Sequence, residues 1–473
     1  MDKTTPTARE SRGKYQTLVI VGAGVFLSTM DSSMVNVALP FIMRTFEAQL
    51  RQVQWVILIY LLAITVTLLF WGIVCDRIGK YRTYFTGIVV FLLSSVGCSL
   101  ASSLPVLISI RFVEGLGAAM MMAAGPTIIR DVFPVSQLGR GLGLIGIATS
   151  AGLMSGPVIG GFLINSFSWR AIFLVCIPVS VIILVGGLVF MRKAGPGTTP
   201  AQPRRFDLKG ALLWTGLISS GVLYGHYLPR LEPFGKLIGF IWLAALLILF
   251  YLAEKSRKSN LLPLHLFSKN YYHIGLITAA LSFGSLFVVL VLMPFYLSYA
   301  RNLGADLIGL VMMAVPLTLF VVSPTAGYIF DRLGSKYLTT LGLIVCTLAL
   351  LALATIDART SYITICLSLA CLGMGQAMFL VPNTASLLSR IGDDEAGITS
   401  GLLATSRNLG MLTGAAFAGM VFGAWYAFFT SGDELANFQP ELVDPFISAF
   451  RATILCVSLV SLVNVMISWQ RKG

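Results

Sequence analysis

Apolar stretches long enough to cross a lipid bilayer recur from one end of the chain to the other, and they constrain the fold more than any other feature. A helix needs about 20 predominantly apolar residues to span the hydrocarbon core. In that core every backbone N–H and C=O must be hydrogen-bonded within the protein, and a helix achieves this by itself. Only 11% of the 473 residues are charged, against about 25% in a soluble domain. Because the deficit extends along the whole chain, the sequence predicts an all-α integral membrane protein rather than a soluble protein with one anchor.

Fourteen of these stretches are predicted to be transmembrane helices. The polar segment 1–14 lacks a short apolar core followed by a small-residue cleavage site, so the first stretch is interpreted as a span and not as a signal peptide. The predicted spans lie near residues 15–40, 52–74, 83–102, 105–129, 139–164, 169–191, 208–228, 234–253, 273–299, 307–329, 338–356, 361–382, 397–426 and 446–469.

The basic residues indicate which side of the membrane holds the termini. An even number of spans places both termini on one side. If that side is the cytoplasm, most of the 33 lysines and arginines lie in cytoplasmic segments, including the clusters at 192–209 and 255–258, while the last external loop at 433–444 is acidic. This is the positive-inside pattern. It explains the net charge of +13 without a nucleic-acid partner, and we expect a multi-pass protein of the cell (inner) membrane with both termini in the cytoplasm.

An internal repeat relates the two ends of the chain. Short motifs recur at nearly constant spacing: Gly72–Lys80 and Gly327–Lys336, Gly115–Gly117 and Gly373–Gly375, and the pairs Gly152/Gly156 and Gly410/Gly414. We therefore predict two related six-helix bundles in parallel orientation, spanning 1–191 and 273–473. A cytoplasmic linker at 192–207 and an insertion of two helices with the following loop at 208–272 would separate them. Two halves around a central site is the arrangement that transporters use for alternating access.

Four motifs together resemble the major facilitator superfamily, and specifically its fourteen-helix drug:proton antiporters. The segment 72–82 is similar to the superfamily loop G-x-x-x-D-R-x-G-R/K, and Met30–Pro40 is similar to the helix 1 signature L-D-x-T-V-V-N-V-A-L-P. Ser155–Gly161 resembles the helix 5 antiporter motif, which implies export. Arg111–Gly117 resembles the helix 4 motif R-x-x-Q-G-x-G, with Glu114 where glutamine is usual.

Asp31 is the strongest candidate for a functional residue, because an ionisable side chain at membrane depth costs about 2.5–3.5 kcal/mol on insertion scales. It lies about 14 Å from Pro40 along the first span, and Glu114 lies at a similar depth in the fourth span, with Arg111 one turn away. If the two spans are neighbours, as the resemblance implies, the three side chains share one layer. The hypothesis is that Asp31 couples transport to protons, with Arg111 and Glu114 tuning or relaying the proton. The alternative is a static Asp31–Arg111 pair that fixes helix packing.

The second half lacks this chemistry, because the repeat places Ser285 opposite Asp31 and leucines opposite Arg111 and Glu114. Apolar, aromatic and Met-rich side chains that can re-pack around varied ligands are expected there. The predicted substrate cavity comprises Asn36, Ser285, Phe287, Met374, Gln376, Met378, Arg407 and Asn408. Arg407 and Asn408 could contact either an anionic group or a layer of carbonyl groups, and the sequence does not distinguish these alternatives. For any single apolar residue, ordinary core packing is an equal alternative.

Two further sets of residues are expected to control conformational change. A latch between helix ends, holding the outward-facing state, is predicted from Gly72, Asp76, Arg77, Gly79 and Lys80, with Asp331 and Arg332 as its weaker repeat. A small-residue ridge that lets a helix pack closely and act as a gate is predicted from Gly152, Gly156, Pro157, Gly160 and Gly161. The alternatives are a plain topology signal for the first set and packing alone for the second.

The predicted function is proton-coupled export of lipophilic or amphipathic small molecules, as in multidrug efflux. We find no catalytic constellation, no phosphate-binding loop and no cysteines at metal-ligand spacing, so we expect no enzyme activity, no metal and no cofactor. The alternatives are an exporter of one metabolite, siderophore or lipid-like compound, and a non-transporting membrane sensor. The expected partners are a small-molecule substrate, protons and the lipid bilayer, with a periplasmic adaptor if the source is Gram-negative; we expect a monomer.

Overall fold

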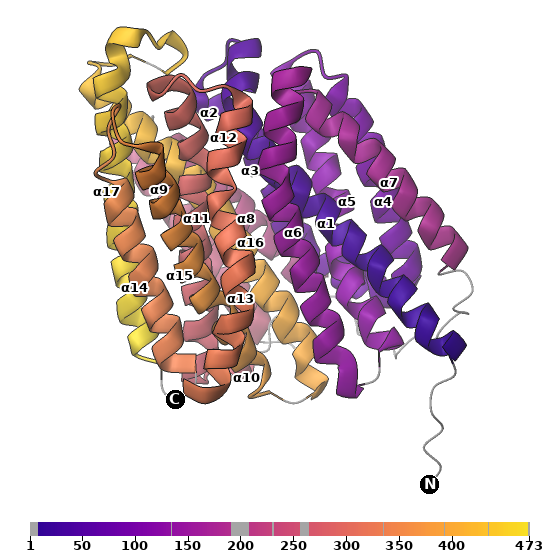
Figure 1. Cartoon of the computed structure of the whole chain (residues 1–473). Coiled ribbons are helices and arrows are strands. Elements are labelled where there is room, and N and C mark those ends of the chain that lie inside the picture. Colours follow the sequence, from indigo (N-terminus) through magenta and orange to yellow (C-terminus); the bar gives the residue numbers. More distant parts are fainter. Residues whose placement is uncertain are drawn as a thin grey trace.

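The computed structural model describes residues 8–133, 135–190, 208–228, 231–255, 264–333, 335–391, 393–433 and 435–471. Within these ranges the regular structure is entirely helical (Figure 1). The long helices are α1 Ala8–Thr45, α3 Trp55–Ile78, α4 Lys80–Ser99, α5 Leu104–Val132, α6 Val135–Ser166, α7 Ala171–Phe190, α8 Leu208–Tyr227, α9 Pro233–Lys255, α11 Asn270–Phe295, α13 Ala314–Leu333, α14 Ser335–Leu353, α15 Tyr362–Leu388, α16 Asp393–Phe429 and α17 Val443–Trp469. Shorter elements are α2 Leu50–Val53, α10 Leu264–Phe267, the π-helix η2 Tyr296–Ala300, α12 Ala305–Met312 and the 3₁₀ turns η3 Leu435–Asn437 and η4 Pro440–Leu442.

The all-helical membrane fold predicted from the apolar stretches is confirmed. Twelve helices in the described ranges are long and apolar enough to cross a membrane. Helices α6 and α8 coincide with predicted spans but are not among those twelve, so the number fourteen stays a prediction.

The long helices run side by side in two groups, α1 and α3–α7 on one side and α11–α17 on the other (Figure 1). Helix α1 begins and α17 ends at the same end of the bundle, at the bottom of Figure 1. We call this the terminal end and the opposite one the distal end.

The two groups repeat the same close contacts. A Cβ atom added to Gly117 on α5 would lie 2.8 Å from the Gly87 carbonyl oxygen on α4, and one added to Gly375 on α15 would lie 2.6 Å from the Gly342 carbonyl oxygen on α14. Such glycine pairs let two helix backbones approach closely. Corresponding helices of the two groups therefore pack through corresponding small residues.

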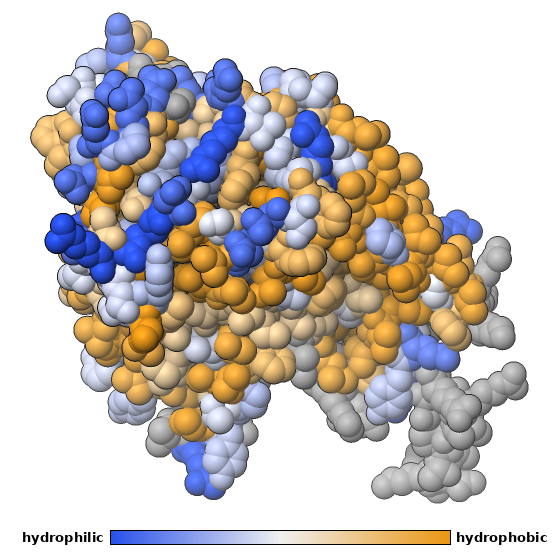
Figure 2. Space-filling model, turned by 45° about the horizontal axis from the view of Figure 1, so that its top comes forward, coloured by the Kyte–Doolittle hydropathy of each residue, from blue (hydrophilic) through white to orange (hydrophobic). Residues whose placement is uncertain are grey.

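Helices α8 and α9 pack differently from the rest. Helix α8 contacts both groups, through α3 and α16, and the Trp214 indole N–H donates to the Thr65 carbonyl at 3.3 Å. Helix α9 packs on α8 and leaves many large apolar side chains exposed, among them Phe240, Ile241 and Trp242. Figure 2 shows apolar side chains over the flanks and hydrophilic ones gathered at the distal end. An exposed apolar flank of this kind suits contact with lipid.

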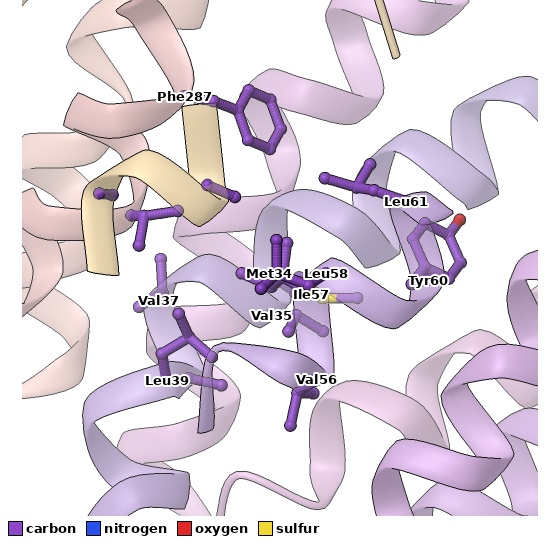
Figure 3. Close-up of a cluster of buried hydrophobic side chains, with 14 of the residues drawn as sticks. Met34, Val35, Val37, Leu39, Val56, Ile57, Leu58, Tyr60, Leu61 and Phe287 are labelled. Atoms are coloured by element: carbon purple, nitrogen blue, oxygen red, sulfur yellow. The ribbon is translucent and has the colours of Figure 1, made fainter. Parts of the chain in front are cut away.

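The two groups meet in the distal half of the bundle. Figure 3 shows part of the shared core, to which Val37 and Leu39 of α1, Leu58 of α3 and Phe287 of α11 contribute; all four are buried. Nearer the distal end, Arg44 Nη2 donates to Ser298 Oγ at 3.0 Å. This packing closes the described part of the molecule toward its distal end.

Candidate functional site

Asp31, Arg111 and Glu114 form one fully buried cluster between α1 and α5. One Arg111 nitrogen, Nη1, donates to Asp31 Oδ2 at 2.7 Å and to Glu114 Oε2 at 2.8 Å. All three side chains have no exposed surface. The structure therefore brings together the three residues that the depth count placed in one layer.

Glu114 receives further hydrogen bonds from α4. Ser95 Oγ donates to Glu114 Oε1 at 2.7 Å, and Cys98 Sγ lies 3.5 Å from Glu114 Oε2. The sequence reasoning missed Ser95 and Cys98. In the sequence they are two small polar residues one turn apart on a helix that neighbours α5. Whether they face Glu114 depends on how α4 and α5 pack.

Aromatic side chains and backbone complete the surroundings of Arg111. Its guanidinium carbon lies 4.1 Å from the centre of the Tyr60 ring and 5.7 Å from that of Phe173. Its Nε donates to the Val56 carbonyl at 3.3 Å. Cation–π contacts of this kind are stronger when they are shielded from water.

Two polar atoms of the cluster have no hydrogen-bond partner, Asp31 Oδ1 and Arg111 Nη2. Two carboxylates beside one guanidinium would carry a net negative charge if both were ionised. Burying an uncompensated charge is strongly unfavourable, and like charges that share a site cannot both ionise easily. One proton on either carboxyl would remove the excess negative charge.

The corresponding place in the other group is apolar. The repeat aligns Ser95, Cys98, Arg111 and Glu114 with Leu350, Leu353, Leu369 and Leu372, and all four leucines are buried. Ser285, aligned with Asp31, donates to the Leu281 carbonyl of its own helix at 3.0 Å. The charged cluster of α1 and α5 therefore has no counterpart at the aligned positions of the other group.

The small-residue ridge of α6 faces two neighbours. Gly156 contacts Ser33 on α1, and Gly152 contacts Phe26 and Thr29 on the same helix. Gly160 would place a Cβ 3.1 Å from Met34 Cγ. The ridge therefore packs α6 tightly against the helix that carries Asp31.

The other side of this ridge reaches the second group. Gly161 contacts the Ala305 carbonyl of α12, and the Pro157 carbonyl contacts Gly309. The antiporter-like motif thus joins α1 on one side and α12 on the other, and part of it lies at the interface between the two halves.

The predicted latch lies at the terminal end, between α3 and α4. Lys80 Nζ contacts both Asp131 carboxylate oxygens at 2.6 Å, joining the start of α4 to the end of α5 in the same half. Asp131 was not predicted from the sequence. Arg77 and Gly79 are exposed and Gly72 is half-buried, while the side chain of Asp76 lies outside the described residues.

Gly79 has a backbone conformation that explains its place in the motif. Its φ of +104° and ψ of +135° belong to a backbone region that residues other than glycine rarely adopt. A Cβ at this position would meet no atom within 4 Å. The requirement for glycine is therefore conformational, since it ends α3 and starts α4 with no intervening loop.

The weaker repeat of the latch differs in its contacts. Arg332 bonds to the Tyr328 hydroxyl one turn back on α13 and lies over its ring at 4.5 Å. The Asp331 side chain lies outside the described residues.

The predicted cavity residues occupy several environments. Gln376 Oε1 accepts from Ser282 Oγ at 2.7 Å, and Arg407 Nη2 donates to Thr384 Oγ1 at 2.6 Å. Asn36 and Asn408 are buried, and each has an amide atom without a partner. The remaining apolar members divide between the buried Phe287 of the distal core and the half-buried Met374 and Met378.

A separate groove of about 630 Å³ opens at the distal end. It lies between the segment after α1, the first turn of α5 and the end of α8, and Phe46, Arg51, Trp55 and His226 are among its lining residues. None of the three charged residues of the buried cluster lines it. Nor do the described residues contain three His, Cys, Asp or Glu side chains placed to hold a metal ion.

Comparisons with known proteins identify relatives along most of the chain. A sequence profile of the Major Facilitator Superfamily matches residues 21–415. The riboflavin transporter RibZ of Clostridioides difficile is 32% identical over 86% of this chain and 88% of its own length. The multidrug resistance protein Stp of Mycobacterium tuberculosis is 30% identical over 88% of this chain and 77% of its own. The tetracenomycin C resistance and export protein of Streptomyces glaucescens is 27% identical over 89% and 78%.

Solved structures share the fold at low identity. A bacterial homolog of the human lysosomal transporter Spinster, in an inward-facing and unoccupied conformation, superposes with a TM-score of 0.67 at 13% identity, covering 98% of this chain and 97% of that one. A D-xylose–proton symporter gives 0.65 at 15% identity, covering 96% and 97%.

Proposed function

Since the chain belongs to the Major Facilitator Superfamily and is a membrane transporter, we propose that it is a proton-coupled exporter of lipophilic or amphipathic small molecules, acting as an antiporter. The observation that carries the proposal is the buried cluster of two carboxylates on one guanidinium, at 2.7 and 2.8 Å. A group that exchanges one proton in the membrane interior is what such an antiporter requires. Relatives named for drug resistance and export support the direction of transport.

Within the cluster, Asp31 is the proposed proton carrier. Glu114 accepts from Ser95 and Arg111 and contacts Cys98, whereas Asp31 accepts from Arg111 alone and leaves Oδ1 without a donor. Hydrogen bonds to a carboxylate favour its ionised form. Glu114 therefore remains the permanent counter-ion of Arg111, and Asp31 is the carboxyl that gains and loses the proton.

Protonation of Asp31 would change the attachment of α1 to α5. The charge-assisted bond from Arg111 to Asp31 weakens when the carboxyl is neutral, while the bond from Arg111 to Glu114 lies within α5 and persists. Helix α1 is then free to shift. A shift would change its packing on Gly152, Gly156 and Gly160 of α6. This is a direct route from proton binding to the helix that also contacts α12 of the other half.

The proposed topology has fourteen spans in the cell (inner) membrane, with the linker 192–207 and the terminal end in the cytoplasm. The halves are the predicted bundles, and α8 and α9 are the insertion. Because the halves meet in the distal half, this arrangement would admit substrate from the cytoplasm. The latch of Asp76, Arg77 and Lys80 would engage the second half only when the terminal end closes, which agrees with Lys80 holding Asp131 of its own half here.

A second candidate function is transport of one metabolite of the flavin class. It rests on the 32% identity to a riboflavin transporter over most of both chains. A planar, acceptor-rich ring system would suit the same half-buried methionines on α15.

Transport by the purified protein in liposomes tests these alternatives. With an imposed pH gradient, we expect proton-driven movement of several lipophilic dyes. Movement of riboflavin alone would favour the second candidate. Dye movement that requires ATP, or that ignores the pH gradient, would reject proton-coupled export.

A further inference from the structure

Arg407 on α16 lies within a membrane-spanning helix, and no carboxylate in the described part of the chain forms an ion pair with it. Its Nη2 donates to Thr384 Oγ1 on α15 at 2.6 Å, and its guanidinium lies 5.7 Å from the Phe283 ring on α11. Its Nε is buried and has no partner. Arg407 does not take part in the ion pairs Lys80–Asp131, Arg111–Asp31 and Arg111–Glu114.

No acid on the same helix is placed to neutralise this charge. The acidic residues of α16 lie in its first turn, at 393–395, which is about 18 Å or more along the axis from Arg407. The repeat partners of the buried acids, on α11 and α15, are Ser285 and Leu372. A guanidinium with one hydroxyl partner is far from satisfied, since it carries five N–H donors.

Arg407 is not the only buried donor without a partner in this half. Asn408 Nδ2 and Gln376 Nε2 lack acceptors, and both residues are at least 97% buried. Together with Arg407 Nε, these amides are donors that could bind acceptor groups of a ligand from this half.

We propose that Arg407 binds an anionic group of the transported compound, so that the substrates are anionic or zwitterionic amphiphiles carrying a carboxylate or a phosphate. The inference rests on the proposed export function and adds the charge class of its substrates. A planar guanidinium pairs with such groups through two parallel N–H···O bonds, which a lysine does not reproduce. The absence of a second unpaired carboxylate in the described core argues against dicationic substrates.

The place of the guanidinium agrees with this role. Thr384 lies one turn before α15 ends at Leu388, so Arg407 reaches toward the terminal end. Under the proposed topology this is the cytoplasmic side, where a substrate for export enters. The half-buried Phe283 and Thr384 beside it leave the group accessible from the space between the helices.

Ligand binding in detergent tests the inference without any gradient. The probes are two pairs that differ in an anionic group: rhodamine B with its free carboxylate against the esterified rhodamine 6G, and riboflavin 5′-phosphate against riboflavin. Wild-type protein is expected to bind the anionic member of at least one pair about tenfold more tightly. Arg407→Gln should remove this preference, and Arg407→Lys should retain part of it.

A matched control is Arg451→Gln, which should leave the preference intact, because Arg451 donates to the Ile356 and Thr355 carbonyls near the distal end. Equal binding within both pairs by wild-type protein would overturn the inference, and so would a preference that survives in Arg407→Gln. If phosphatidylglycerol binds in a way that Arg407→Gln abolishes and the probes do not, the anion is a lipid headgroup and the substrate assignment fails.

The outcome is separable from that of the proposed function. Charge preference at Arg407 without proton-driven transport would reject the export mechanism alone. Proton-driven transport with no charge preference would reject this inference alone.

Discussion

Arg111 is held between two buried carboxylates, and removing different members of the cluster has unequal costs. Without the arginine, Asp31 and Glu114 lose the positive charge that both contact. The cation–π contact between Arg111 and the Tyr60 ring, at 4.1 Å, is lost as well. Breaking a buried ion pair by removing one partner costs about 3–5 kcal/mol. Replacing Glu114 by glutamine instead removes one of two negative charges and leaves Arg111 paired with Asp31.

We predict that Arg111→Met destabilises the protein by about 3 kcal/mol or more, and that Glu114→Gln costs less than half of this. Thermal unfolding in detergent, followed by the fluorescence of a thiol-reactive dye, measures the difference. An Arg111→Met variant as stable as Glu114→Gln would show that the cluster is held by packing and not by charge.

At this scale the sequence predicted the three charged residues, because depth along a helix follows from counting residues. It did not predict Ser95, Cys98 or Asp131, because their roles depend on which faces of α4 and α5 meet. Gly87 and Gly117 let α4 and α5 pack closely, but the sequence does not show that these two glycines face each other.

At the scale of elements, the loop between α3 and α4 is reduced to one residue, Gly79. Its φ of +104° makes any other residue strained by about 1–3 kcal/mol. The adjacent Lys80–Asp131 pair is partly exposed, and surface pairs contribute about 0–1 kcal/mol.

Gly79→Ala is accordingly expected to lower the unfolding free energy more than Lys80→Gln does, although it removes no contact. Thermal unfolding of both variants in the same detergent checks the order. The reverse order would mean that the motif is kept for its charges rather than for its backbone.

The α6 ridge gives an element-scale prediction about conformation. Gly161→Val should clash with α12 at Ala305 and push the halves apart in the distal half, whereas Gly423→Val meets open space. In a background without native cysteines, Ser298→Cys is buried and should react slowly with a membrane-impermeant maleimide; Gly161→Val should speed the reaction several-fold. Equal rates in the Gly161→Val and Gly423→Val variants would remove the proposed contact role.

For the whole molecule, the positions of the twelve described helices long and apolar enough to span a membrane were predictable, because such stretches follow from composition alone. The contact of the halves in the distal half was not predictable, because it depends on which faces of α1, α6 and α12 pack together. The bridging position of α8, against α3 and α16, also depends on tertiary packing.

Fourteen spans with cytoplasmic termini make a specific prediction for the inserted helices. Glu232→Cys, between α8 and α9, should react with an impermeant reagent from outside the cell, and Ser389→Cys, just after α15, only from the cytoplasm; both positions are exposed. Labelling of both positions from one side would contradict the topology.

The central claim is that Asp31 carries the coupled proton while Glu114 keeps Arg111 neutralised. The most direct measurement is substrate-dependent proton flux into liposomes that contain the Asp31→Asn or the Glu114→Gln variant. We predict that Asp31→Asn abolishes this flux but still moves substrate down its own gradient, and that Glu114→Gln retains coupled flux at a reduced rate. Coupled proton flux that persists in Asp31→Asn and disappears in Glu114→Gln would contradict the account.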